Sequence, residues 1–193
     1  MRIVKCLLIA MMALMITACG GKEEEAAVSE NKAVEETTQD TAENQEPVKL
    51  FGVFDSQTLD GEEVTEEIFA EADLTMVNIW GTFCNPCIME MPDLGELSRE
   101  YADKGFQIVG LVSDVMEPGD ETAMEIVKET KADYRHLIAS EDLINNVLRY
   151  VSSVPTTVFV DREGNVVGEV YSGMRDKETW ELIITQCLVE VQD

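Results

Sequence analysis

The sequence is short of basic residues and almost without histidine. It has 14 lysines and arginines against 39 aspartates and glutamates, a formal net charge of -25, and one histidine, His136. A chain this acidic repels a phosphate backbone, which argues against nucleic-acid binding. One histidine offers little from which to build a metal site, so we expect His136 to be structural and predict no metal and no cofactor. Hydrophobic residues still make up 45% of the chain, enough for one packed domain.

Residues 1–18 have the features of a signal peptide. Arg2 and Lys5 precede an uncharged apolar run at residues 6–18, which is too short to span a bilayer comfortably. The run ends in Ile-Thr-Ala-Cys-Gly around Cys19, which resembles the lipobox of bacterial lipoproteins. The resemblance implies that Cys19 becomes the first residue, carries a diacylglyceryl group, and anchors the chain on the extracytoplasmic face of the cell membrane. The alternative is a plain secretory signal with a cysteine near its cleavage site.

The segment that follows, residues 19–46, is expected to be a lipidated cysteine and a disordered acidic tether. Residues 20–46 hold nine acidic residues against two lysines and almost no large apolar side chains. Such a segment buries too little surface to offset its ordering entropy, and its like charges extend it. We expect a solvated spacer, with partner binding through the acidic residues as the alternative.

From residue 47 the pattern changes to short apolar runs separated by turn signals, which predicts one folded domain over residues 47–193. A helix between the apolar runs at 74–80 and 106–112 supplies the crossover that parallel pairing needs. The order predicts an α/β fold with a mixed central sheet and helices on both faces. Strands are expected at 48–54, 74–80, 106–112, 134–138, 157–161 and 166–170, a turn at 60–61, and helices or helical turns at 62–71, 85–103, 121–131, 141–150 and 176–191.

The chemistry is expected at Cys84 and Cys87, where the strand at 74–80 meets the helix at 85–103. Two cysteines at this spacing close a disulfide in a tight turn. The unpaired N–H groups and dipole of the helix start favour a thiolate, so Cys84 is the expected nucleophile with a lowered pKa. Cys87, one turn inside the helix, is the expected resolving thiol. The pair relays a disulfide to or from a partner through a mixed disulfide.

The segment around these cysteines resembles a known family. The run Trp-Gly-Thr-Phe-Cys-Asn-Pro-Cys at residues 80–87 is similar to the active-site segment of membrane-anchored thioredoxin-like proteins of the TlpA/ResA family. Glu90 and Pro92 match that family's acidic residue and proline. Residues 153–157 (Ser-Val-Pro-Thr-Thr) match its cis-proline segment, and residues 114–131 look like its central insertion. The resemblance implies a thioredoxin-like fold with an N-terminal extension and this insertion.

The resemblance also implies roles for individual residues. The Val154–Pro155 bond would be cis, the Val154 backbone would pair with an extended substrate, and Pro155 would shield the dithiol. Trp80 and Phe83 flank the dithiol and form a candidate apolar docking surface, although Trp80 fits the sheet core equally well. Glu90 is either a surface glutamate or, as the family suggests, a partly buried carboxylate that moves protons or tunes a thiol pKa.

Asn78 departs from the pattern of thioredoxin itself, which has a buried aspartate six residues before its first active-site cysteine. An amide cannot shuttle protons, so Glu90 or water must serve if Cys87 needs deprotonation. We expect Asn78 to be a satisfied polar group of the core. Cys187 recurs among apolar residues at helical spacing and is expected to pack rather than react.

The function that the resemblance implies is extracytoplasmic thiol-disulfide exchange. The expected partners are disulfide-bearing client proteins, such as an apocytochrome c or a methionine sulfoxide reductase, and a membrane electron donor of the thioredoxin-reducing type. We expect a monomer that reduces its clients, although Asn85-Pro86 between the cysteines does not determine the direction.

The sequence supports other functions for the cysteine pair less well. A zinc site needs four ligands, and no second pair follows, while copper chaperones of related fold have wider cysteine spacing. A c-type haem needs a histidine directly after Cys87, where Ile88 stands. A thiol peroxidase is the enzymatic alternative, but it would place its reactive cysteine in another loop context. A redox-inert docking protein would not need the cysteine pair or Pro155.

Overall fold

The computed structural model describes residues 48–192. The predicted signal peptide, the lipidation site Cys19 and the acidic tether lie outside the described residues. Five strands of the described part form one sheet in the order β5-β4-β3-β6-β7. They are β3 (Leu74–Trp80), β4 (Phe106–Val112), β5 (Arg135–Ile138), β6 (Thr156–Asp161) and β7 (Val166–Ser172).

The sheet is mixed, as predicted. β3, β4 and β5 run parallel, whereas β6 runs antiparallel to β3, and β7 antiparallel to β6. β3 pairs with β4 along its whole length, from Leu74 opposite Phe106 to Trp80 opposite Val112. Every residue of β3 is buried, as expected of a central strand that is covered on both faces. The predicted βαβ unit is confirmed.

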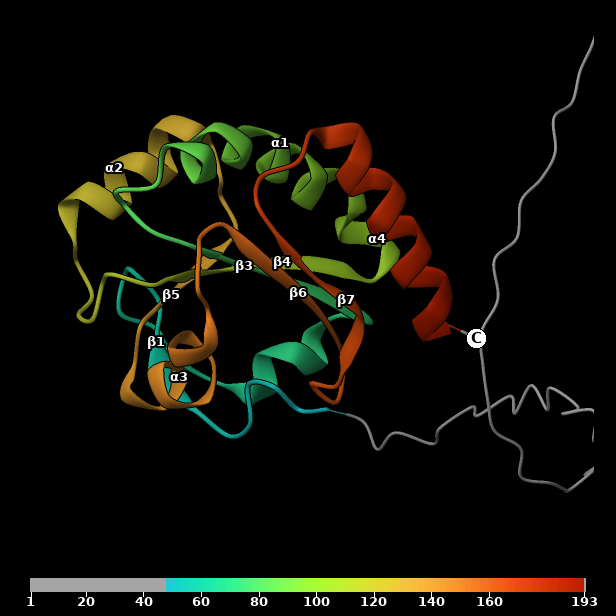
Figure 1. Ribbon diagram of the computed structural model, residues 1–193, viewed down its shortest axis with the longest axis horizontal. Coiled ribbons are helices and arrows are strands. Elements are labelled where there is room, and N and C mark those ends of the chain that lie inside the picture. The colour runs from blue at the N-terminus through green and yellow to red at the C-terminus, as the bar shows by residue number, and fades with distance from the viewer. Residues whose placement is uncertain (1–47, 193) are drawn as a thin grey trace, which may run out of the picture. The chain divides into compact units, whose positions relative to one another are not determined.

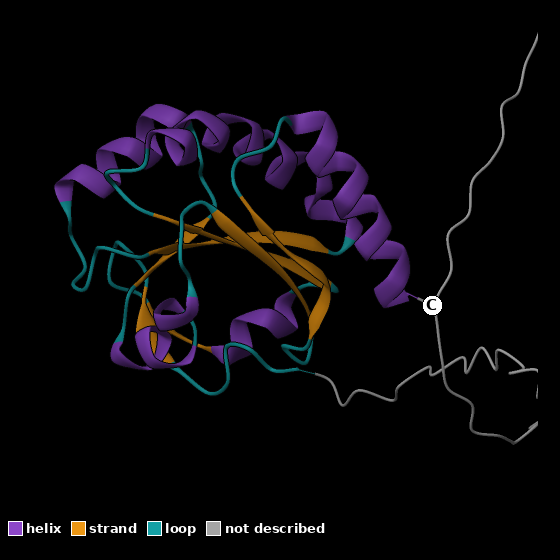
Figure 2. Cartoon of the chain, viewed as in Figure 1, coloured by secondary structure: helices purple, strands orange, loops and turns teal. Residues whose placement is uncertain are grey.

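Helices cover both faces of the sheet (Figures 1 and 2). α1 (Asn85–Tyr101), α2 (Glu121–Thr130) and α4 (Lys177–Gln192) lie on one face. α3 (Glu141–Asn146) and the 3-10 helix η1 (Glu66–Glu71) lie on the other. The predicted fold class is therefore confirmed. α2 belongs to the predicted insertion and forms the crossover between β4 and β5.

The position of α1 depends on close packing against its neighbours. A Cβ at Gly95 would collide with the carbonyl oxygen of Lys131, so only glycine allows the helix to approach this backbone so closely. Lys177 at the start of α4 reaches Glu96 and Glu100 on α1 at 3.0 and 2.7 Å. These contacts hold α1, and with it the two cysteines, against the end of α2 and against α4.

Residues 48–54 do not form the strand that their composition predicts, so that prediction was wrong. Gly52 has a φ of +60°, a left-handed conformation that interrupts an extended run. Phe51 and Phe54 are nevertheless buried, with ring centroids 5.4 and 6.0 Å from that of Phe69. The two phenylalanines of this segment therefore pack in the core, although the segment forms no strand.

Two predicted helical segments are shorter than expected. Residues 62–71 divide into η1 and a short strand β2 (Glu63–Thr65), which pairs with β1 (Asp55–Gln57) across the predicted turn. The Thr65 hydroxyl then caps η1 by accepting from the N–H of Glu67. Residues 141–150 divide into α3 and a 3-10 turn, η3 (Leu148–Tyr150). Two asparagines and a valine at the end of α3 are weak helix formers, which accounts for its early end.

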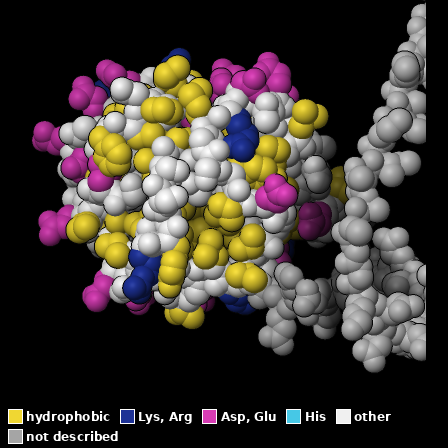
Figure 3. Space-filling model, viewed as in Figure 1, with side chains coloured by type: hydrophobic (Ala, Val, Ile, Leu, Met, Phe, Trp, Pro, Cys, Tyr) yellow, Lys and Arg dark blue, Asp and Glu magenta, His cyan; other side chains and the backbone are white. Residues whose placement is uncertain are grey.

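The described surface is uneven in polarity. Figure 3 shows hydrophobic side chains gathered over the region where α3, β6 and β7 lie in Figure 1, with acidic side chains around them. Among residues 48–192, no helix has both the length and the apolar character needed to cross a membrane.

Candidate active site

Cys84 and Cys87 lie at the N-terminus of α1 and are joined by a disulfide. Their Cα atoms are 5.3 Å apart. Cys84 is the N-cap residue of α1, and its Sγ accepts a 3.2 Å hydrogen bond from the N–H of Cys87. Cys84 is 5% exposed and Cys87 is fully buried. The sulfur at the helix N-terminus is therefore the one that a partner can reach first.

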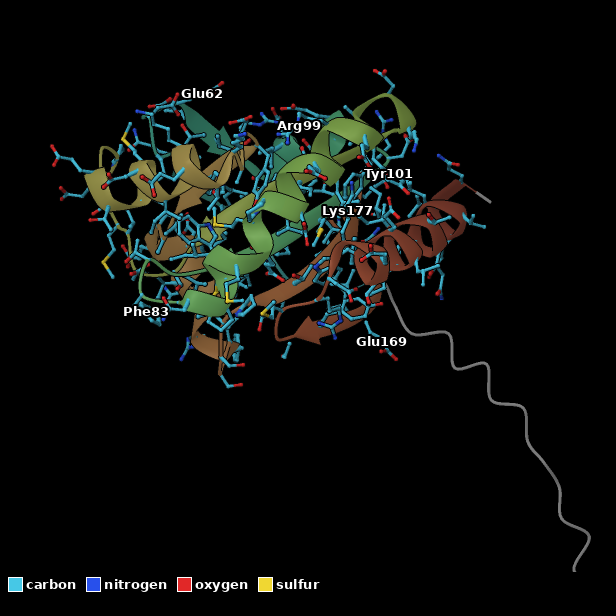
Figure 4. The ribbon with its side chains drawn as sticks, turned by 90° about the horizontal axis from the view of Figure 1, so that it is seen from above. Glu62, Phe83, Arg99, Tyr101, Glu169 and Lys177 are labelled. Carbon is cyan, nitrogen blue, oxygen red and sulfur yellow. A yellow bond between two sulfur atoms is a disulfide. The ribbon has the colours of Figure 1, made fainter. Side chains whose placement is uncertain are left out.

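The loop before Cys84 is held from two sides. Asp114, after β4, accepts hydrogen bonds from the N–H of Thr82 at 3.0 Å and from its hydroxyl. The ring of Phe83 folds over Gly81, where a Cβ would lie 2.7 Å from a ring carbon. Phe83 is 71% exposed, and Figure 4 shows it at the edge of the molecule beside the start of α1. An apolar ring thus stands at the surface beside the disulfide.

The Val154–Pro155 peptide bond is cis, as the family resemblance implied. The carbonyl oxygen of Pro155 accepts from the N–H of Gly173 at 2.8 Å, and the Thr156 hydroxyl donates to Ser153 at 2.8 Å. Val154 packs against the core cluster that contains Cys84 and Cys87. Its N–H and C=O make no hydrogen bond within residues 48–192. Backbone groups beside the disulfide are therefore free to pair with another chain.

Glu90 is buried, at 1% exposure, one helical turn after Cys87 and on the same face of α1. Its carboxylate accepts from Asn78 Nδ2 at 3.0 Å and from the N–H of Arg175 at 3.2 Å. Burial raises the pKa of Glu90 above its ordinary value, and these two donors, the nearby Trp180 indole and the Arg175 charge offset only part of the rise. A carboxyl with a raised pKa next to a dithiol is suited to exchanging a proton with it.

The surroundings of Glu90 contain polar atoms without partners. Asn78 Nδ2 also donates to Thr157 at 3.2 Å, but Asn78 Oδ1, the Tyr134 hydroxyl and Trp180 Nε1 have no hydrogen-bond partner within residues 48–192. Burial and the charge of Glu90 raise the pKa of Tyr134 above its ordinary value. Asn78 is thus buried, but it is only partly satisfied, contrary to expectation. Its unpaired oxygen lies beside a carboxyl that binds protons readily.

Trp80 does not contribute to a docking surface in this structure. It is fully buried, and its indole N–H donates to Nδ1 of His136 at 3.1 Å. His136 is buried as well, with Nε2 bonded to the Ala132 carbonyl at 2.9 Å. Burial lowers its pKa to about 4, so it is neutral at physiological pH. Trp80 belongs to the core because side chains alternate along β3 and position 80 faces α1.

Other predicted residues lie where expected, and some site residues were missed. Cys187 is buried in α4, where burial raises its pKa to about 11. The sequence pattern did not point to Arg175, whose backbone binds Glu90, or to Tyr134. Tyr134 directly precedes β5 and Arg175 lies in the loop after β7, and no local motif marks such long-range contacts. Within residues 48–192, no group of three or more His, Cys, Asp or Glu side chains is placed to hold a metal ion.

Comparison with known proteins agrees with this geometry. The chain is 33% identical over 107 residues to a thiol-disulfide oxidoreductase ResA of Bacillus cereus, a match that covers 54% of this chain and 58% of the relative's length. It is 29% identical to the thioredoxin-like protein YneN of Bacillus subtilis, covering 66% and 72% of the two chains. The chain thus spans little more than half the length of the first of these relatives.

Solved structures show the same fold. A thiol:disulfide interchange protein of the thioredoxin family from Chlorobium tepidum superposes with a TM-score of 0.61 at 25% identity, covering 74% of this chain and 95% of that one. StoA of Bacillus subtilis superposes with a TM-score of 0.55 at 17% identity, covering 70% and 98%. The predicted thioredoxin-like fold is therefore confirmed. Residues 31–181 match the Redoxin family, and the chain belongs to that family.

Proposed function

We propose that this chain is an extracytoplasmic thiol-disulfide oxidoreductase that reduces disulfides of exported client proteins. The observation that carries the proposal is the redox pair itself: Cys84 and Cys87 form a disulfide at a helix N-terminus, beside the unpaired backbone of Val154. A helix N-terminus favours the thiolate that attacks a disulfide. Relatives named as thiol-disulfide oxidoreductases support the same activity.

The reaction starts from the reduced pair. The Cys84 thiolate attacks one sulfur of the client disulfide, a bond forms between Cys84 and the client, and the second client sulfur leaves as a thiolate. Cys87 then loses its proton and attacks Cys84, which closes the Cys84–Cys87 disulfide and releases the reduced client. Two electrons pass from the chain to the client. A membrane electron donor of the thioredoxin-reducing type restores the dithiol.

Glu90 is the group best placed to take the proton from Cys87. It follows Cys87 by one turn on the buried face of α1, where water has little access. Because burial raises its pKa, the carboxylate is a stronger base than an exposed glutamate. Asn78 and the backbone of Arg175 hold the carboxylate in place.

Trapping experiments with the full-length chain test the activity. Cys87→Ser should accumulate a mixed disulfide between Cys84 and a disulfide-bearing protein such as insulin, and Cys84→Ser should form none. Cys187→Ser is the matched control: Cys187 is buried on α4, so reduction of insulin should be unchanged. If Cys84→Ser retains the activity of the natural chain, the proposal is wrong. Faster reaction with hydrogen peroxide than with insulin would favour a thiol peroxidase instead.

The membrane location rests on residues outside the described part of the chain and is part of the proposal. A short apolar signal ending at Cys19, followed by an acidic tether, suits a lipid-anchored domain that sweeps a volume near the membrane. The natural chain should incorporate labelled palmitate in a bacterial host and fractionate with membranes. Cys19→Ala should do neither, and labelling that survives this substitution would refute the anchor.

A further inference from the structure

An apolar cleft of about 200 Å³ opens between η3 and the strands β6 and β7. None of the ten residues that line it is charged, although the chain carries a net charge of -25. Its apolar lining consists of Leu50, Ile79, Val147, Tyr150, Val151, Val158 and Val170. An uncharged cleft on so acidic a protein is suited to an apolar group.

The cleft opens on the surface that Figure 3 shows as hydrophobic. Tyr150 at one side is 71% exposed, and Val170 at the other is 54% exposed. Large apolar side chains exposed together mark interaction sites more often than isolated ones do. Val170 lies on β7, one of the two edge strands of the five-stranded sheet.

The cleft lies at the same end of the sheet as the disulfide but on the opposite face. Ile79, which lines it, directly precedes Trp80, and the two side chains belong to core clusters on opposite faces of β3. Val154 connects the two sides, because it packs against both clusters. Thr156, two residues further on, lines the cleft itself.

We propose that this cleft binds one large apolar side chain of the client polypeptide whose disulfide Cys84 attacks. The inference rests on the proposed function. A client strand that pairs with the free N–H and C=O of Val154 would run over the end of the sheet from Cys84 toward the cleft. An engineered cavity of 150 Å³ is known to hold a benzene molecule, so 200 Å³ suits a leucine or phenylalanine side chain.

Strand spacing gives the position of this side chain in the client. β3, β6 and β7 are neighbours in the sheet, and neighbouring strands lie about 4.8 Å apart. The far side of the cleft, at Val170 on β7, is therefore displaced by roughly 10 Å along the sheet from β3, which Cys84 follows. An extended chain covers that span in about three residues. The preferred client carries an apolar residue about three positions from its cysteine.

Short peptides with one cysteine, blocked as a mixed disulfide with thionitrobenzoate, test the inference. The full-length chain is first reduced with dithiothreitol, which is then removed. Its dithiol is oxidised to the disulfide, while one peptide thiol and one coloured thionitrobenzoate are released. The peptides carry leucine, phenylalanine or serine three positions before or after the cysteine. We expect an apolar residue on one side to raise the second-order rate constant about tenfold over serine, through partial burial of one side chain.

A matched pair of variants assigns that preference to the cleft. Val170→Asp should abolish it, and so should Tyr150→Ser, which adds no charge. Val189→Asp should keep it, because Val189 on α4 is 57% exposed, close to the 54% of Val170, but does not line the cleft. Thermal unfolding of each variant controls for folding.

The outcomes separate the inference from the proposed function. Two results would refute binding of a client side chain in the cleft: equal rates for all peptides, or a preference that persists in both cleft variants. In either case the natural chain would still release thionitrobenzoate, so the proposed function would stand. If the reduced natural chain released none, even from the small disulfide dithiobis(nitrobenzoate), the proposed function would fail and the inference with it.

Discussion

Asn78 and Glu90 are 12 residues apart in the sequence, yet the Asn78 amide on β3 donates a 3.0 Å hydrogen bond to the Glu90 carboxylate on α1. Both side chains are buried, at 0% and 1% exposure. The pair joins the central strand to the helix that carries the disulfide. Where thioredoxin has an aspartate on this strand, the present chain has an amide on the strand and a carboxyl on the helix.

Replacing Asn78 with aspartate tests this pairing. Asn78→Asp removes the donor and places a second carboxyl beside Glu90, so two like charges would share a buried site. We expect the free energy of unfolding at pH 7 to fall by about 3 kcal/mol, and by less at lower pH, where the pair holds a proton. Urea unfolding at two pH values measures this. Asn145→Asp, at an exposed position of α3, should cost less than about 0.5 kcal/mol.

Replacing Glu90 with glutamine should change how stability depends on pH. The pKa of Glu90 is raised in the folded chain, so its stabilising contribution is complete below its ordinary pKa of 4.5 and is lost as pH rises through the raised value. Glu90→Gln should therefore melt a few degrees higher than the natural chain at pH 7, and the difference should shrink below about pH 4. Equal melting temperatures at every pH would show that the carboxyl is not perturbed.

The same variant tests the proton transfer. An amide cannot take the proton of Cys87, so the mixed disulfide with a client should resolve more slowly in Glu90→Gln. The first attack by Cys84 should change little by comparison. Stopped-flow measurement of the two phases separates them, and an unchanged second phase would remove Glu90 from the reaction.

The two tryptophans form a matched pair for the energy of one buried hydrogen bond. Both are fully buried, but Trp80 donates a hydrogen bond of good geometry to His136. Trp180 Nε1 lies near Glu90 and helps to lower its pKa, but it makes no hydrogen bond of such geometry within residues 48–192. Trp80→Phe leaves Nδ1 of His136 buried without a donor, so it should cost about 1–3 kcal/mol more than Trp180→Phe. Urea unfolding at neutral pH measures both. An equal or larger cost for Trp180→Phe would contradict the hydrogen bond.

Phe83 should matter for clients rather than for folding. Phe83→Ser should change the free energy of unfolding by less than about 0.5 kcal/mol, because the ring is 71% exposed. It should slow the reduction of insulin by about tenfold, because the client loses an apolar contact beside its disulfide. Leu182→Ser, at a position on α4 that is 74% exposed, is the control and should leave both quantities unchanged. Equal rates for the two variants would count against a docking role.

The strands predicted best are those whose apolar pattern follows directly from their burial in the sheet. β3 and β4 begin and end at the predicted residues because buried parallel strands form continuous apolar runs bounded by polar residues. Residues 48–54 have a similar composition but fail, since Gly52 turns the chain and the phenylalanines pack without pairing. The composition of this segment indicates that its phenylalanines are buried, but it does not show whether the backbone forms hydrogen bonds with a neighbouring strand.

The sequence also predicted one part of the candidate site and missed another. The positions of Cys84, Cys87 and the cis bond follow from local motifs and from the resemblance that those motifs carry. The surroundings of Glu90 do not, because Tyr134 and Arg175 reach it from elements far along the chain. The sequence did not decide whether Trp80 lies in the core or on the surface. An apolar residue next to a motif fits either place until it is known which face of the strand it occupies.

The reduction potential of the Cys84–Cys87 couple decides whether the chain reduces or oxidises its clients. Cys87 is fully buried among apolar side chains, which disfavours its thiolate, so the reduced pair is less stabilised and donates electrons more readily. Equilibrating the full-length chain with dithiothreitol or glutathione buffers, and trapping free thiols, gives the potential. We expect a value near thioredoxin's, about -270 mV, whereas a potential of about -120 mV would make the chain a disulfide donor and contradict the proposed reductase activity.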